Sequence, residues 1–221
     1  GDVGAIDVKV TATDGSGATT TDTFTITVTN TNDAPTISST GVTSATEDAA
    51  YSYTFQASDI DVGDSVTYAA TTKPDWLTFN TETGVLSGTP TNDNVGDHAV
   101  VLTATDSNSA VTTQSFTITV ANTNDAPTIS STALLEATQD AGYSYTFEAS
   151  DVDSGDILTY AATTKPSWLD FNSSTGVLSG TPSNSHIGDH SVVLTATDST
   201  GAVATQSFTI TVGNTNDAPT I

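Results

Sequence analysis

One string of six residues, Asn-Asp-Ala-Pro-Thr-Ile, occurs three times, with its aspartate at positions 33, 125 and 217. Both spacings are 92 residues (125 − 33 = 92; 217 − 125 = 92), and ungapped pairing of the two intervals gives 68 identical positions out of 92. A fixed period of this length indicates tandem copies of one folding unit. The sequence therefore predicts the end of one repeat over residues 1–32, whole repeats over 33–124 and 125–216, and the start of another over 217–221.

Within each repeat the apolar residues alternate with polar ones, as in Tyr51–Ala57 and Ser115–Val120. This period of two marks strands with one buried face. Turn signals such as Lys73-Pro74 and Thr83-Gly84 separate the strands, and no stretch of ten residues has helical periodicity. About seven short strands in a unit of this length are typical of an immunoglobulin-like antiparallel sandwich. The predicted fold class is therefore all-β.

The first 32 residues carry the apolar pattern of only two strands, and two strands cannot bury such a face alone. We expect this segment either to be disordered or to pair with another chain by strand addition. The residues of this apolar face are Ile6, Val8, Val10, Phe24, Ile26 and Val28.

Acidic residues dominate the charge of the chain, which has 221 residues, 3 basic and 26 acidic, for a net charge of −23. A polyanion of this kind is repelled by phosphate backbones and anionic lipids, so the sequence predicts neither nucleic-acid binding nor membrane insertion. The absence of cysteine excludes disulfides and thiolate metal sites. Carboxylates that lysine and arginine cannot neutralise favour binding of hard cations.

The first acidic cluster is Asp59-x-Asp61-x-Gly63-Asp64, which directly follows a predicted strand and recurs 92 residues later. Calcium takes 6–8 oxygen ligands and accepts irregular geometry, whereas magnesium demands a stricter octahedron. The cluster is not an EF-hand loop, because the twelfth position, counted from Asp59, is Ala70 and not glutamate. The pattern therefore favours a calcium site built from loops.

The second cluster is the junction string Asn122–Pro127, in which Asx side chains offer oxygens and proline stiffens the chain. It has no large apolar residue to fix the angle between neighbouring repeats, and a bridging cation would fix it. The alternative is that these acidic residues are solvated surface groups, as we expect for Asp48 and Asp97.

Several segments resemble known repeats. "ASDIDVGDSVTY" at 57–68, "LTATD" at 102–106 and "ITVANTNDAP" at 118–127 resemble the motifs of cadherin-like repeats. "PDWLTFNTETGVLSGTP" at 74–90 resembles the dystroglycan-type cadherin-like and Ig-like tandem repeats of large bacterial surface adhesins. The resemblance covers both whole repeats. It implies tandem immunoglobulin/cadherin-like antiparallel β-sandwiches in a linear array, secreted to the bacterial cell surface.

In cadherins, calcium lies between consecutive repeats and stiffens the rod, so the resemblance implies ligands at each junction. For the first junction they are Asn30, Asn32, Asp33, Asp59, Asp61 and Asp106. For the central junction they are Glu47, Asn122, Asn124, Asp125, Asp151, Asp153 and Asp198. Asparagine replaces the first aspartate of the family's linker and alanine follows its second, so we expect one or two Ca²⁺ per junction. Gln139 replaces Glu47 in the next repeat, and we expect weaker calcium binding there.

Three functions fit this sequence. The first is a calcium-stiffened spacer of an extracellular adhesin, whose partners are the neighbouring repeats and which supports cell adhesion. The second is a lectin-like module that binds polysaccharide, and the third is a strand-exchanging subunit of a surface filament. A lectin-like module needs exposed aromatic rings; the candidates are Trp76, Tyr68, Trp168 and Tyr160. The alternative for Trp76 is packing under a loop, beside Leu77 and Phe79.

Enzymatic activity is not predicted. Glycosidases use paired carboxylates, but Asp59 and Asp61 come from one turn of a small sandwich, where no deep apolar cleft is expected. The chain has no Gly-x-Ser-x-Gly elbow, no phosphate-binding loop and no histidine-rich metal motif.

Overall fold

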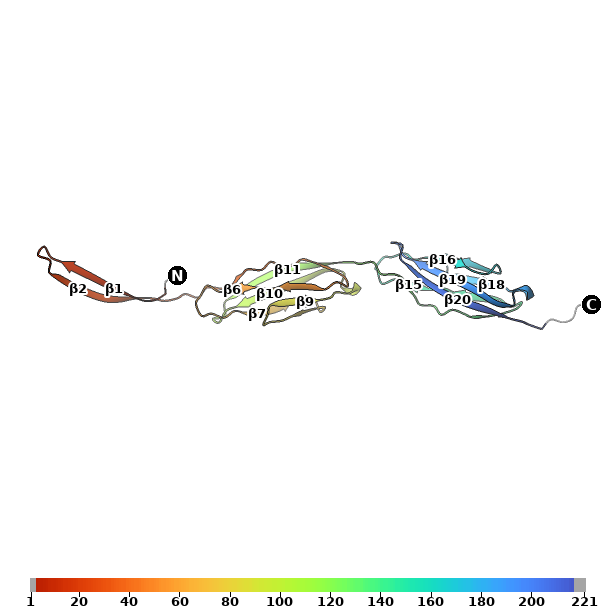
Figure 1. Ribbon diagram of the computed structural model, residues 1–221, viewed down its shortest axis with the longest axis horizontal. Coiled ribbons are helices and arrows are strands. Elements are labelled where there is room, and N and C mark those ends of the chain that lie inside the picture. The colour runs from red at the N-terminus through yellow and green to blue at the C-terminus, as the bar shows by residue number, and fades with distance from the viewer. Residues whose placement is uncertain (1–2, 217–221) are drawn as a thin grey trace, which may run out of the picture. The chain divides into compact units, whose positions relative to one another are not determined.

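The computed structural model describes residues 3–216, which form strands, turns and two short 3₁₀ helices, with no α-helix in that range. The chain divides into two compact units, residues 1–121 and 122–221. The first unit contains a hairpin and one sandwich, and the second unit contains one sandwich (Figure 1). The prediction of an all-β chain is confirmed.

The elements of the first unit are a two-stranded hairpin followed by nine strands and one 3₁₀ helix. They are β1 (Gly4–Thr13), β2 (Thr19–Val28), β3 (Thr36–Ile37), β4 (Ser44–Thr46), β5 (Tyr51–Thr54), β6 (Ala57–Ser58), β7 (Thr67–Thr72), β8 (Leu77–Phe79), β9 (Val85–Gly88), η1 (Asn92–Asn94), β10 (Gly96–Thr105) and β11 (Val111–Ala121).

The second unit repeats the nine strands and the 3₁₀ helix in the same order. They are β12 (Thr128–Ile129), β13 (Glu136–Thr138), β14 (Tyr143–Thr146), β15 (Ala149–Ser150), β16 (Thr159–Thr164), β17 (Leu169–Asn172), β18 (Val177–Gly180), η2 (Asn184–His186), β19 (Gly188–Thr197) and β20 (Val203–Gly213).

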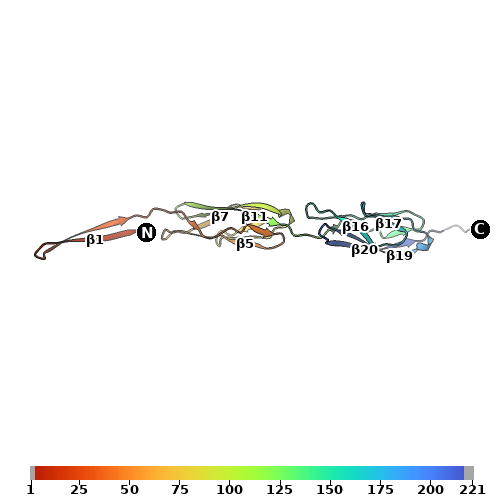
Figure 2. The same cartoon turned by 90° about the horizontal axis from the view of Figure 1, so that it is seen from above.

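Each repeat is a sandwich of a four-stranded and a three-stranded sheet, with a separate two-stranded ladder. In the first repeat the strand orders are β4-β11-β10-β7, β5-β9-β8 and β3-β6, and the second repeat has the same arrangement. β4 runs parallel to β11, and the other pairs in the two sheets are antiparallel. Figure 2 shows β7 and β11 in one layer and β5 in the other. The predicted sandwich is confirmed.

Apolar side chains at alternate strand positions fill the space between the two sheets. Leu102 on β10 and Ile118 on β11 are fully buried, and they face Tyr51 and Tyr53 from β5. The tyrosine hydroxyls are satisfied, since Tyr51 donates to the Val42 carbonyl at 2.8 Å and Tyr53 donates to Gln114 at 2.6 Å. Buried aromatic hydroxyls require such partners.

The predicted strand Tyr51–Ala57 is interrupted in the structure. β5 ends at Thr54 and pairs with β9, whereas β6 begins at Ala57 and pairs with β3. Between them the Phe55 amide donates to the Gly84 carbonyl at 2.8 Å. Gly84 has φ +70°, and a Cβ there would lie 2.3 Å from the Phe55 carbonyl oxygen. The chain therefore changes partner strands here, and only glycine permits the approach.

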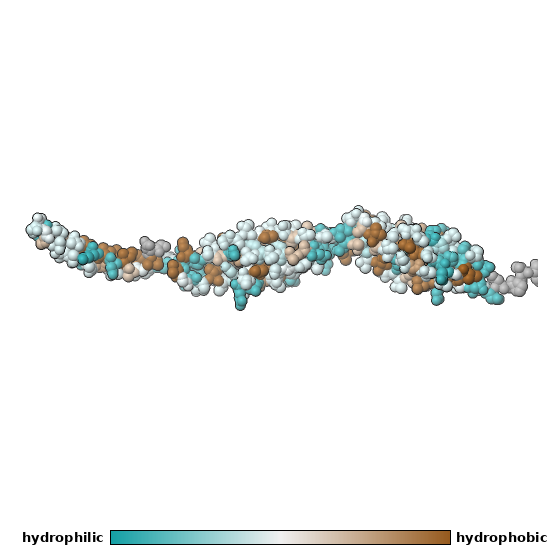
Figure 3. Space-filling model, in the orientation of Figure 1, coloured by the Kyte–Doolittle hydropathy of each residue, from teal (hydrophilic) through white to brown (hydrophobic). Residues whose placement is uncertain are grey.

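The N-terminal hairpin is ordered, with ten residue pairs between β1 and β2. Its apolar side chains are uncovered: Ile26 is 47% exposed and Val28 is 37% exposed, whereas the corresponding Ile118 of the first whole repeat is fully buried and Val120 is 2% exposed. Brown residues are visible along this hairpin in Figure 3. Of the two expectations for this segment, disorder is wrong for residues 4–28, and strand addition stays a prediction.

Candidate metal centre

Each repeat contains a cluster of carboxylates in the loops that connect its strands. In the first repeat Asp59 follows β6, Asp64 precedes β7 and Asp106 follows β10, and one oxygen of each lies within 4.8 Å of the others. In the second repeat the group comprises Asp151, Asp153 and Asp156, which all lie between β15 and β16, and Asp198, the counterpart of Asp106, is not in it. Clustered carboxylate oxygens are the ligands that calcium prefers in proteins.

Some of these oxygens are buried without a hydrogen-bond partner among the described residues. They are Oδ2 of Asp59, Oδ2 of Asp151 and Oδ2 of Asp156. The other oxygens of Asp59 and Asp151 accept backbone N–H groups two residues later, at 2.8 and 2.9 Å. Burying a carboxylate oxygen without a donor is costly. The donor set and the partnerless oxygens therefore fit a bound cation.

The last aspartate of each Asp-x-Asp-x-Gly-Asp string accepts a hydrogen bond from a serine hydroxyl. Ser107 donates to Oδ1 of Asp64 at 2.5 Å, and Ser199 donates to Oδ1 of Asp156. Each serine follows the aspartate at the end of β10 or β19. The cluster is thus assembled from segments about forty residues apart in the sequence.

Hydrogen bonds hold the linker before each repeat to the same acidic loops. Asn32 donates to Asp106 Oδ2 at 2.8 Å, and the Asp33 amide donates to Asp61 Oδ2 at 2.8 Å. The second repeat reproduces both contacts at 2.8 Å, from Asn124 to Asp198 and from the Asp125 amide to Asp153. The linker therefore belongs structurally to the repeat that follows it.

Asp106 and Asp198 organise the turn at the end of their strands. Oδ1 of Asp198 accepts backbone amides from residues 200, 201 and 202, while Oδ2 accepts the Asn124 side chain. The Asn124 hydrogen bond contributes most to lowering the pKa of Asp198 to about 2, although burial opposes the shift. The bond from Asn32 likewise lowers the pKa of Asp106 below its ordinary value. Both groups stay ionised, as metal ligands must be.

The structure gathers most of the predicted ligands, but not all, at one end of their repeat. In the second repeat Asn122 donates to Oδ1 of Asp153 at 2.9 Å, so it joins the cluster. Asn30 lies exposed after β2. Glu47 and Asp106 lie at opposite ends of β11. The backbone N–H of Glu47 donates to Ala121 at the end of that strand, whereas Asp106 begins the turn that leads into it, so Glu47 lies away from its own repeat's cluster.

The predicted ligand set omitted Asp64 and Asp156, which the structure places in the clusters. Their presence in the repeated string Asp-x-Asp-x-Gly-Asp was the available signal. The serines that fix them, Ser107 and Ser199, could not be recognised, because they lie 43 residues further along the chain.

The aromatic residues considered for carbohydrate binding pack within their repeats. Trp76 is half-buried and makes edge contacts with Tyr51, at 5.8 Å between ring centroids, and with His98, at 6.0 Å. The Tyr68 hydroxyl donates to the Ala57 carbonyl at 3.1 Å. The second repeat has the same contacts around Trp168 and Tyr160. The packing interpretation of Trp76 therefore describes its surroundings better than a stacking platform does.

Two facing sheets with acidic loops at one end, present twice in the chain, define an immunoglobulin- and cadherin-like tandem-repeat protein. The family described as "Putative Ig domain" matches residues 34–121 and 126–213. The chain belongs to this family. The search against curated proteins finds no match.

Solved structures with similar folds include cadherin ectodomains. PcdhgB3 EC1-4 is 18% identical with a TM-score of 0.62, over 96% of this chain and 58% of that one. Protocadherin Gamma B2 extracellular cadherin domains 1-5 are 20% identical with a TM-score of 0.57, over 97% and 47%. An endo-fucoidan hydrolase from glycoside hydrolase family 107 is 27% identical with a TM-score of 0.40, over 97% and 35%. The chain thus spans about a third to three fifths of the length of these proteins, and the cadherin likeness shows the fold.

This repeat fold is typical of non-enzymatic modules, and cadherin-like and Ig-like domains are typically extracellular. Over residues 3–216, no helix has the length and apolar character needed to cross a bilayer.

Proposed function

We propose that this chain is a calcium-binding segment of an extracellular bacterial adhesin, in which the repeats act as stiff, non-enzymatic spacers that support cell adhesion. The observation that supports this function best is the set of buried, partnerless carboxylate oxygens in the acidic loops of both repeats. The 26 acidic residues have only three lysines as internal counter-charge. Two of those lysines, Lys73 and Lys165, bond the backbone carbonyls of Leu77 and Leu169.

In the first repeat, Asp59, Asp64 and Asp106 would hold the ion, with Asp61 and the Asn32 oxygen as further ligands. Calcium suits such a set because it accepts 6–8 oxygens in irregular geometry, whereas magnesium demands a near-ideal octahedron. When bound, calcium supplies the positive charge that offsets the clustered carboxylates. In the second repeat Asp151, Asp153 and Asp156 would hold the ion, with Asn122 and Asp198 as further ligands.

Stiffening would follow from the position of the linkers. Asn32 and Asp33 already bond the loops that form the first cluster, and Asn124 and Asp125 bond those that form the second. A cation in each cluster would fix these loops and therefore the linker held against them. Without it, carboxylates separated by less than a Debye length repel one another, and the loops and linkers would loosen.

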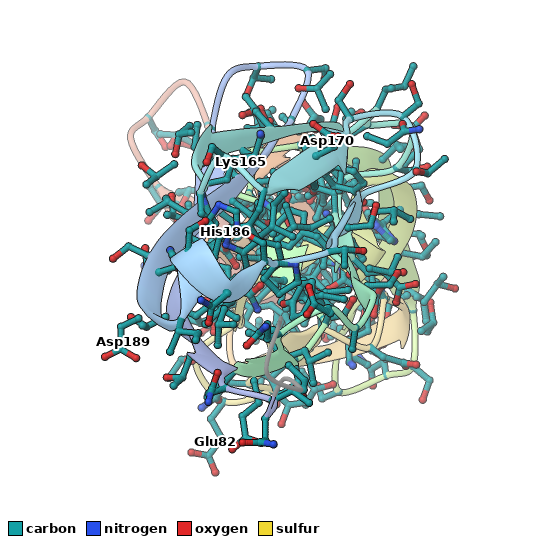
Figure 4. All side chains as sticks on the ribbon, turned by 90° about the vertical axis from the view of Figure 1, so that its right-hand side faces the viewer. Glu82, Lys165, Asp170, His186 and Asp189 are labelled. Atoms are coloured by element: carbon teal, nitrogen blue, oxygen red, sulfur yellow. The ribbon has the colours of Figure 1, made fainter. Side chains whose placement is uncertain are left out.

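Small-angle scattering with and without calcium tests this function. We expect the maximum dimension to fall and the scattering to indicate flexible linkers when a chelator removes calcium. The matched control replaces Asp97 and Asp189 with asparagine, since these acids lie outside the clusters and accept hydrogen bonds from cross-strand threonine hydroxyls at 2.6 and 2.7 Å. Figure 4 shows Asp189 pointing away from the second repeat. Scattering that is identical in calcium and in chelator, from protein that binds no calcium, would reject the proposal.

A lectin-like function has less support, because the four aromatic residues that it would use pack within the repeats. A direct titration of the chain with polysaccharide tests this alternative.

Strand exchange is the second candidate function, and the exposed apolar face of the N-terminal hairpin favours it. In each whole repeat the same face of the corresponding hairpin is covered by the three-stranded sheet. A complementary segment from another polypeptide would cover it in the same way. Light scattering of the purified chain tests this idea. We expect self-association that Ile26→Asp abolishes and that Thr23→Asp, on the opposite face, preserves; a monomer at high concentration would contradict it.

A further inference from the structure

The two repeats differ at one buried position near the end from which the chain leaves each repeat. Glu47 and Gln139 occupy equivalent places after β4 and β13, and each is 3% exposed. Their backbones make the same contacts. The backbone N–H of Glu47 donates to the Ala121 carbonyl, and the backbone N–H of Gln139 donates to the Gly213 carbonyl, both at 3.0 Å. One site therefore holds a carboxylate, and the other holds a neutral amide of the same length.

The side-chain amide of Gln139 connects Asp140, the next residue, with the segment that leaves the repeat. Nε2 donates to Asp140 Oδ2 at 3.0 Å, and Oε1 accepts the backbone N–H of Thr215 at 3.3 Å. The Thr215 hydroxyl also donates to the Gln139 carbonyl at 3.3 Å. One side chain thus uses a donor and an acceptor at once, which only an amide can do here.

A glutamate at position 139 could not make both contacts. An ionised carboxylate only accepts hydrogen bonds, so it would lose the bond to Asp140 and place a second negative charge beside that residue. In a site that is 3% exposed, an added carboxylate requires donors or a counter-charge. A cation would meet that requirement, whereas glutamine removes it.

We propose that Gln139 forms a cation-independent clasp on the segment that leaves the second repeat. This inference rests on the proposed function in one respect, because it exempts this exit from the calcium dependence that the acidic loops would confer on the linkers.

Amide hydrogen exchange at Thr215, measured by NMR on the full chain, tests the clasp. In the unmodified chain we expect its exchange rate to change by less than about twofold between calcium and chelator, as expected when no ion contributes. In Gln139→Glu the exchange in chelator should be roughly three- to tenfold faster than in calcium, the range for loss of one hydrogen bond. In Gln139→Ala it should be fast in both conditions.

Calorimetric calcium titration of the same variants gives a second readout. Gln139→Glu should bind more calcium than the unmodified chain, and Gln139→Ala should bind the same amount. If Thr215 is unprotected in chelator in the unmodified chain, or if Gln139→Glu exchanges identically with and without calcium, the clasp is refuted. A chain that binds no calcium anywhere, yet keeps Thr215 protected through Gln139, would instead refute the proposed spacer function.

Discussion

Replacing Asp59 and Asp151 with asparagine should change the stability of the protein in opposite directions with and without calcium. Asparagine keeps the oxygen that accepts the backbone N–H of Asp61 or Asp153. It replaces the buried, partnerless Oδ2 with an NH₂ group that carries no charge. The variant therefore removes repulsion from the empty cluster and removes a ligand from the calcium-bound one.

The size of the effect follows from the separation of the charges. Two unit charges no more than 4.8 Å apart repel by at least about 0.9 kcal/mol at the dielectric constant of water and about 3.5 kcal/mol at an effective constant of 20. Calcium at 100 times its dissociation constant would stabilise the folded state by about 2.7 kcal/mol. For a unit of this size, that corresponds to roughly 10–20 °C in the melting temperature.

Calorimetry of the unmodified chain and the double variant, in calcium and in chelator, provides the assay. We expect the variant to melt higher than the unmodified chain in chelator and lower in calcium. Asp97→Asn with Asp189→Asn serves as the control, and it should leave the calcium response intact. If the unmodified chain melts identically in both conditions and the variant is destabilised in both, the aspartates serve the fold alone and the reasoning fails.

Two further predictions concern the scaffold. Asn124→Ala should raise the pKa of Asp198 from about 2 toward its ordinary 3.8, measured by carboxyl NMR titration. Because the folded-state pKa is depressed, this group stabilises the fold above about pH 4 and loses that contribution as the pH falls through 2, so the variant should lose less stability in this window. Gly176→Ala should cost roughly 3 kcal/mol or more in denaturant unfolding, because a Cβ would lie 2.3 Å from the Phe147 carbonyl oxygen. Gly155→Ala, which also has positive φ but meets nothing within 4 Å, should cost about 1 kcal/mol; equal costs would contradict the steric explanation.

The alternation of apolar and polar residues predicted a strand correctly where the whole segment pairs within a single sheet. Ser115–Val120 lies within β11, and its alternating side chains form one wall of the core. The same alternation failed at Phe55, because the periodicity of a strand does not report which neighbour it pairs with. The change of partner there depends on Gly84, a residue 29 positions away.

The candidate metal site was likewise predicted from local strings only in part. The string Asp-x-Asp-x-Gly-Asp identified an acidic loop, and the junction string identified a linker rich in oxygen donors. The set of carboxylates that meet was predicted only in part, because Asp64 approaches Asp106 through the packing of β7 against β10. Contacts between residues far apart in sequence depend on strand pairing, which a single sequence does not reveal.

By itself, the sequence determined the 92-residue period, the alternating faces that become the core and the excess of negative charge, since each is a property of neighbouring residues or of simple counting. Tertiary structure alone decided which carboxylates meet in each repeat and that the linker is held by the repeat after it. It also decided that Gln139 reaches a residue 76 positions later. The physical reason is that sheet pairing brings distant loops together, and the hydrogen bonds and charge repulsions between them exist only once the sheets have formed.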